Sequence, residues 1–137
     1  MSEVKFFLQQ LSFLNEEIEA LQSECELIKA TIYSKEKVVE TNVVNSGDQI
    51  MRLMDTHELI NEKVDELIDL KIQVSNEIDY IDDRKFRIIL RERYINMRSW
   101  EYIAGKLTYE VRHIHRLHGN ALIAFEQVHK VPNKNMS

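Results

Sequence analysis

The sequence predicts an all-helical protein, and three observations support this fold class. The 137 residues include three glycines and one proline, too few for the many tight turns of a β-sandwich or an alternating strand and helix fold. Helix-favouring residues dominate the rest of the chain. Apolar residues recur at steps of three and four, which is the spacing of one face of a helix. The length suits one ordinary domain, or a small domain joined to an extended arm.

Two long stretches carry this helical pattern. The first runs from Val4 to Ile32 without a break, and the second runs from Ile50 to Ile81 and includes His57 in its stripe. Helices of this length exceed what a small core requires, so each apolar stripe needs another long helix to cover it. We expect a coiled-coil-like antiparallel hairpin with a loop at about residues 33–48. The same stripes also fit pairing between subunits, and a homodimer formed through these helices is predicted.

The charge of the chain divides near residue 83. Residues 1–83 hold 7 Lys and Arg against 19 Asp and Glu, a net charge of −12. Residues 84–137 hold 11 against 4, a net charge of +7, and together they give the −5 of the whole chain. A basic segment beside an acidic one predicts contact with a polyanion through the basic half. We therefore expect an acidic arm over 1–82, a basic domain over 83–127 and a disordered tail over 128–137.

Other features argue against enzymes and membrane proteins. Cys25 is the single cysteine and falls on the first apolar stripe, so a buried structural thiol is expected. No apolar run suits a membrane span and no signal peptide is visible, which predicts a cytoplasmic protein. His115 and His118 have helical spacing, yet no further ligand stands at zinc spacing. Without a nucleophile or phosphate-loop motif, we expect no catalytic residue, no metal and no cofactor.

The basic segment divides into three short predicted helices, at about 84–95, 100–107 and 110–125. Ser99 is placed to cap the second helix, and the small Ala104 allows two helices to cross closely. The second helix is expected to bury Ile103, Ala104 and Leu107. The third is expected to bury Ile114, Leu117, Ala121 and Leu122.

This segment resembles the C-terminal helix-turn-helix of sigma factors, the region four type. The resemblance rests on Arg93-Tyr94-Ile95, Ser99-Trp100-Glu101-Tyr102-Ile103-Ala104, Leu107, Ile114, Leu117 and Ala121-Leu122. With the long helices that precede it, the chain is closer still to a family of small phage proteins from Gram-positive bacteria, the ArpU-like or RinA-like regulators of late genes. This second resemblance covers most of the chain.

The sequence departs from the sigma pattern at the turn. Thr108 stands where sigma factors usually have Gly, and Glu110 stands where Ser or Thr opens the recognition helix. Glu is a poor helix cap, so Thr108 is expected to cap the third helix. The other sigma regions are missing, which excludes a complete sigma factor.

The resemblance implies a transcriptional regulator that reads double-stranded DNA with the helix 110–125 in the major groove. Val111, Arg112 and Arg116 match the family's base-reading positions, since Arg can donate two hydrogen bonds to guanine. Phosphate contacts are expected from Arg98, Lys106, His113 and His115, with Asn120 on the same outer face. Host RNA polymerase is a further expected partner, and a bacterial host cell is the expected location.

Two other functions remain open on sequence alone. Small terminase subunits also join a helix-turn-helix to an oligomerising helical part, so a phage DNA-packaging subunit fits the pattern. A helical adaptor that no longer reads DNA also fits, in which case the basic face is simply solvated.

Overall fold

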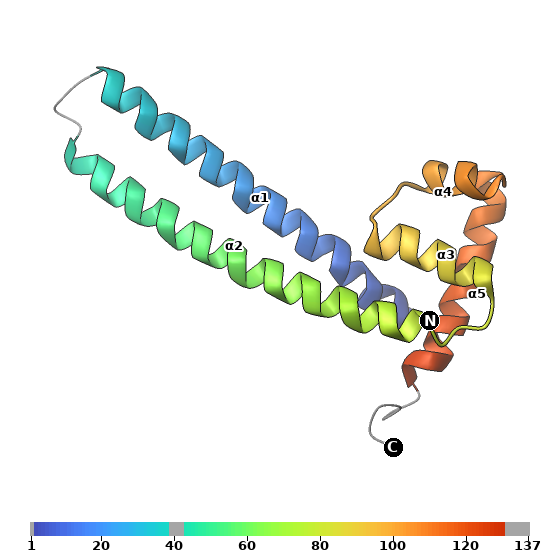
Figure 1. Ribbon diagram of the computed structural model, residues 1–137. Coiled ribbons are helices and arrows are strands. Elements are labelled where there is room, and N and C mark those ends of the chain that lie inside the picture. The colour runs from blue at the N-terminus through green and yellow to red at the C-terminus, as the bar shows by residue number, and fades with distance from the viewer. Residues whose placement is uncertain (1, 39–42, 131–137) are drawn as a thin grey trace. The chain divides into compact units, whose positions relative to one another are not determined.

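The computed structural model describes residues 2–38 and 43–130, with side chains for 3–34 and 47–129. These residues form helices joined by short turns, and the described ranges contain no strand, which confirms the predicted all-helical class. The elements are α1 (Ser2–Val38), α2 (Val43–Ile78), α3 (Arg84–Leu90), the π-helical η2 (Arg91–Ile95), α4 (Trp100–Leu107) and α5 (Val111–Lys130). Figure 1 labels the five α-helices.

Contacts divide the chain into two compact units. One consists of residues 13–68, and the other combines residues 1–12 with residues 69–137. The predicted boundary between residues 82 and 83 marks a change in net charge, and it does not coincide with the division by contacts. By contacts, the first turns of α1 and the last turns of α2 group with the basic segment, because their apolar side chains pack with it.

In the unit of residues 13–68, segments of α1 and α2 run antiparallel. Lys63 pairs with Glu17 at 3.2 Å, whereas Arg52 lies further back along α2 and donates through Nε to Glu24 at 2.9 Å. The side chain of Cys25 is buried on the seam, as predicted. Along one turn of α2, however, the expected seam residue His57 is exposed and its neighbour Thr56 is buried. Burial suits Thr56 because its hydroxyl donates to the carbonyl of Arg52 at 2.8 Å.

The predicted loop at residues 33–48 is too long at both ends. Helix α1 continues to Val38 and α2 begins at Val43, so the described parts of this range are helical. The last turn of α1 is rich in Lys and Glu, which favour helix even where no apolar stripe continues. At the other end of the chain, the predicted disordered tail of 128–137 begins too early, because α5 continues to Lys130. The remaining residues of that tail lie outside the described part.

The second unit has an apolar core built from the start of α1, the end of α2, α3 and α5. Phe7 stacks on Phe125 with ring centroids 6.5 Å apart, and His129 packs 4.6 Å from Phe7. The His129 ring also contacts the Glu77 carboxylate, with Nδ1 3.0 Å from Oε1. These contacts fix the last turns of α5, which explains why the helix extends past its predicted end. The buried apolar residues of the same unit include Val4, Leu8, Leu11, Val74, Ile78, Ile81, Ile89 and Leu90.

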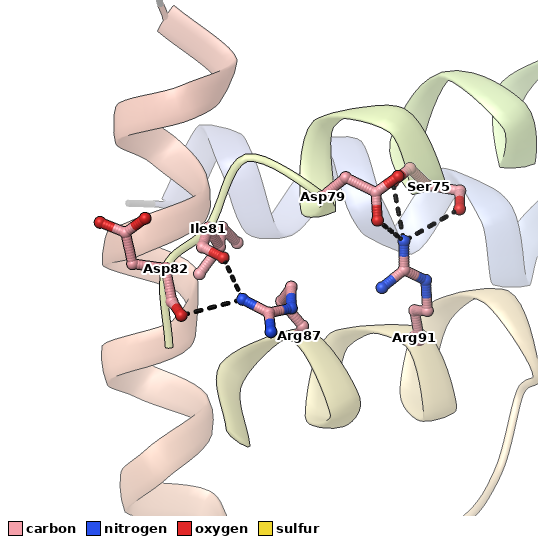
Figure 2. Close-up of polar contacts among 6 residues, drawn as sticks. All are labelled: Ser75, Asp79, Ile81, Asp82, Arg87 and Arg91. Carbon is pink, nitrogen blue, oxygen red and sulfur yellow. Dashed lines mark hydrogen bonds and ion pairs between the residues drawn. The ribbon is translucent and has the colours of Figure 1, made fainter. Parts of the chain in front are cut away.

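Arg87 of α3 and Arg91 of η2 hold these two elements against the last turn of α2 and the residues that follow it (Figure 2). Arg87 donates to the carbonyls of Ile81 at 2.6 Å and Asp82 at 2.8 Å, and Arg91 donates to the carbonyl of Ser75 at 3.1 Å and pairs with Asp79. The Ile81 and Asp82 carbonyls lie just after the end of α2, and the Ser75 carbonyl also accepts from the amide of Asp79 at 3.2 Å. Cationic side chains near a helix C-terminus also interact favourably with the helix dipole. Two of the basic residues that the charge pattern assigns to contact with a polyanion therefore stabilise the fold instead.

The turn between α4 and α5 closes as a Schellman motif. Ser99 caps α4 as predicted, since its Oγ accepts from the amide of Tyr102 at 3.1 Å. At the other end Thr108 is left-handed, with φ 58° and ψ 41°, and the amide of Tyr109 donates to the carbonyl of Ala104 at 2.9 Å. The expectation that Thr108 caps the third helix is wrong. Its hydroxyl donates to the carbonyl of Leu107, and the residue ends α4 instead.

The left-handed position predicts that Thr108→Gly stabilises the protein. A β-branched residue pays a steric cost at positive φ, and this cost exceeds the extra chain entropy that glycine loses on folding. We expect the free energy of unfolding to rise by about 1 kcal/mol, measured by urea denaturation. Thr108→Ala is the control, because it keeps a Cβ and should gain little. A loss of stability in the glycine variant would show that Thr108 is not strained in this turn.

Candidate nucleic-acid interface

A small apolar core sets the orientation of α5. Ile89 of α3, Ile103 and Ala104 of α4, and Ile114 of α5 are all buried together. Trp100, Leu107, Tyr109, Val111 and Leu117 pack partly buried around them. Further along α5, Ala121 and Leu122 are buried as well. The predicted burial is confirmed for Ile103, Ala104, Ile114, Ala121 and Leu122, whereas Leu107 and Leu117 are only partly buried. The opposite side of α5 is left to solvent.

The solvent side of α5 carries four of the predicted DNA-contacting residues. Arg112, His115, Arg116 and Asn120 are all exposed. The guanidinium of Arg116, which can only donate, lies within hydrogen-bonding distance of Nδ1 of His113. Arg112 has no ion pair within the described part of the chain. Two arginines one helical turn apart thus form a small cationic surface on the first half of α5.

Val111 and His113 occupy the margin of this surface. The side chain of Val111 packs partly buried against the apolar core, so only part of it faces outward. The ring of His113 packs edge-on against Tyr109, with centroids 4.6 Å apart. Both residues link the core to the exposed face, and their prediction as DNA contacts stays a prediction.

Arg98 and Lys106, the two predicted phosphate contacts outside α5, converge on the carboxylate of Glu92. Lys106 Nζ lies 2.9 Å from Glu92 Oε2, and Arg98 Nε lies 3.9 Å from Oε1. Asn96 donates to the same carboxylate at 3.1 Å. The hydrogen bond from Lys106 lowers the pKa of Glu92, Asn96 lowers it further, and burial opposes both. The same bond to Glu92 raises the pKa of Lys106.

A second group of rings lies behind the exposed face. The Trp100 ring packs 4.8 Å from the exposed His115 and 4.6 Å from the buried His118, and the Arg93 guanidinium lies 4.3 Å above it. Trp100 therefore packs against the core. It also supports His115 from one side, which limits the directions that this imidazole can take.

His118 belongs to the core and has a fixed protonation state. Burial raises the pKa of Tyr94 to about 12, so its hydroxyl keeps its proton, and it forms a hydrogen bond with Nε2 of His118 at 2.7 Å. Burial is also the largest cause that lowers the pKa of His118 to about 4, followed by the charges of Lys5, Arg93 and His115. His118 is therefore neutral near pH 7 and is not part of an exposed histidine cluster. The sequence indicates this burial, because His118 lies four residues after Ile114 and therefore on the same face of the helix.

Across residues 2–38 and 43–130, no group of three or more His, Cys, Asp or Glu side chains could hold a metal ion. No helix in that part of the chain is long and apolar enough to cross a membrane. Comparison with protein family models, curated proteins and solved structures gave no match. The functional interpretation therefore depends on the geometry of the exposed residues.

The buried His118 predicts a loss of stability in mild acid. Its pKa is about 4 in the folded chain against an ordinary 6.5, so between these values the unfolded chain binds the extra proton. The contribution is complete above pH 6.5 and declines as pH falls toward 4, by about 3 kcal/mol in total. Denaturation of wild type and His118→Gln across this interval measures it, since the variant lacks the titrating group. Equal pH dependence in both proteins would contradict the assignment.

Proposed function

We propose that the chain is a sequence-specific DNA-binding regulator of transcription, with α4, the turn and α5 acting as a helix-turn-helix. The observation that carries the proposal is the pair Arg112 and Arg116, exposed on the first half of α5 and opposite the face that Ile114 anchors. A recognition helix places its N-terminal half against base edges in the major groove. Arginines at that position can each donate two hydrogen bonds to one guanine.

Each neighbouring residue has a proposed role. Arg112 and Arg116 contact guanine or, on other sequences, phosphate. His113 orients Arg116 through its ring nitrogen, and Val111 offers its exposed edge to a thymine methyl group. His115 and Asn120 extend the same face toward the DNA backbone. Arg98, which precedes the Ser99 cap of α4, and Lys106, in the last turn of α4, contact phosphates.

The proposal also gives a role to the acidic arm and names target genes, a protein partner and a location. The proposed arm comprises residues 1–82, carries most of the negative charge and weakens non-specific DNA binding by repulsion. From the resemblance to ArpU-like and RinA-like proteins, we further propose phage late genes as targets, host RNA polymerase as a second partner and the bacterial cytoplasm as the location.

Arg116→Ala is expected to reduce affinity for the preferred site without unfolding the protein, because the side chain is exposed. If Arg116 binds guanine, the cost is about 1 to 3 kcal/mol and the preference at one base pair relaxes. The preferred duplex is first selected from fragments of random sequence, and binding is then measured to it and to a scrambled duplex.

Arg52→Ala is the matched control for Arg116→Ala, since it removes the same charged group from the other compact unit. Only a small, sequence-independent change is expected for it. The melting temperature of each variant establishes that it is folded at the assay temperature. Equal affinity of wild type and folded Arg116→Ala for the selected duplex would refute base reading by this residue.

We also propose that the chain forms a homodimer through the long helices. Phe13 and Leu27 of α1 are 56% and 70% exposed, and Ala20 lies midway between them, seven residues from each. Residues at this interval share one side of a helix, which gives α1 an apolar strip besides its buried seam. A second copy of the chain would cover this strip, and two DNA-reading units would then be joined.

Sedimentation of the full chain is expected to give a dimer, and Phe13→Lys/Leu27→Lys is expected to give a monomer at the same concentration. The control is Glu19→Gln/Glu26→Gln, which changes the net charge equally on the same helix but keeps the apolar strip. It should remain dimeric. A ring of about eight or more subunits would favour DNA packaging instead, and a wild-type monomer would remove the dimer from the proposal.

A further inference from the structure

The most unusual polar group near the proposed interface is the carboxylate of Glu92. Glu92 lies on η2 and is 8% exposed, whereas acidic residues are rarely buried without partners. Its partners are Lys106, Arg98 and Asn96, all within the same compact unit. Because one carboxylate meets two cations, the cluster keeps a net positive charge.

The two cationic side chains of this cluster contact the buried carboxylate and are also accessible to solvent. The side chains of Lys106 and Arg98 are 47% and 51% exposed, although each contacts the buried carboxylate. An ammonium has three donors and a guanidinium has five, so donors remain for a ligand in solvent. The exposed ring of Tyr102 lies 4.6 Å from the Arg98 guanidinium and 6.0 Å from Lys106 Nζ, which further restricts both side chains.

We infer that Glu92 is a positioning residue that holds Arg98 and Lys106 ready to bind one phosphate group of a DNA backbone. This inference rests on the proposed function and adds a residue that does not itself touch DNA. Free Lys and Arg side chains lose rotamer freedom when they bind a phosphate. Here the carboxylate and the tyrosine ring have already restricted that freedom in the unbound protein.

The opposite role for Glu92 would be repulsion of the phosphate. Repulsion alone predicts that removal of the negative charge tightens binding to DNA. The arrangement favours positioning, because the carboxylate is buried and contacts two cations whose side chains are about half exposed. A phosphate would then meet the cations first and the carboxylate only at a greater distance. The two roles predict changes of affinity in opposite directions, so one substitution distinguishes them.

The test measures binding of the full chain to a 30-base-pair duplex of random sequence over a range of salt concentrations. Lys106→Ala is expected to weaken binding by about 3- to 10-fold and to reduce the slope of log K against log salt by about one. Glu92→Gln is expected to weaken binding by about 3-fold although it removes a negative charge. In the double variant the two effects should be less than additive, because Glu92 acts through Lys106.

Glu92→Asp separates position from charge and also covers the case in which Glu92→Gln does not fold. It keeps the negative charge but withdraws the carboxylate from Lys106, so it should weaken binding as Glu92→Gln does. Melting temperatures establish which variants are folded. Tighter binding by folded Glu92→Gln, or wild-type affinity in folded Glu92→Asp, would overturn the positioning role.

Failure of this inference and failure of the proposed function are distinguishable. If wild type binds the duplex and folded Lys106→Ala binds with the same affinity and salt slope, the phosphate subsite is refuted while DNA binding stands. If wild type binds no duplex at low salt, the proposed function and the subsite both fail.

Discussion

The close contact of α3, α4 and α5 through Ile89, Ile103, Ala104 and Ile114 is the constraint on which the proposed interface depends. Burying each isoleucine side chain contributes about 1.5 to 3 kcal/mol relative to exposure. Because these residues fix the rotation of α5 about its axis, they also determine which side faces solvent. A rotation of α5 that buried the arginines would expose Ile114 and place unpaired charges in an apolar core. The free-energy cost of burying an unpaired charge far exceeds that of exposing one isoleucine side chain.

The positive charge of the C-terminal half has at least three different uses. Arg87 and Arg91 donate to carbonyls near the end of α2, and Arg98 and Lys106 contact the buried Glu92. The arginines of α5 make no contact with a carboxylate in the described structure. The net charge of the segment therefore overstates the number of cations that remain to contact phosphate groups. The proposed DNA-binding surface depends on which of these cations the fold leaves exposed.

The sequence predicted those features that depend on local periodicity. The bounds of α4 and the buried side of α5 follow from apolar spacing and from the Ser99 cap, so both were predicted correctly. The partners of Glu92 were not predicted, because Lys106 lies fourteen residues away and only the crossing of the helices brings the two together. Thr108 was misassigned because a turn threonine can end one helix or begin the next, and backbone dihedral angles decide between them.

The central claim is that the exposed side of α5 enters the major groove, and methylation interference tests it most directly. Methylation of guanine N7 blocks the major groove, whereas methylation of adenine N3 blocks the minor groove. With a selected duplex, binding should be lost when particular guanines carry the N7 methyl group, and adenine N3 methylation should have little effect at those base pairs. Binding that is insensitive to N7 methylation at every guanine of the selected site would contradict major-groove recognition by α5.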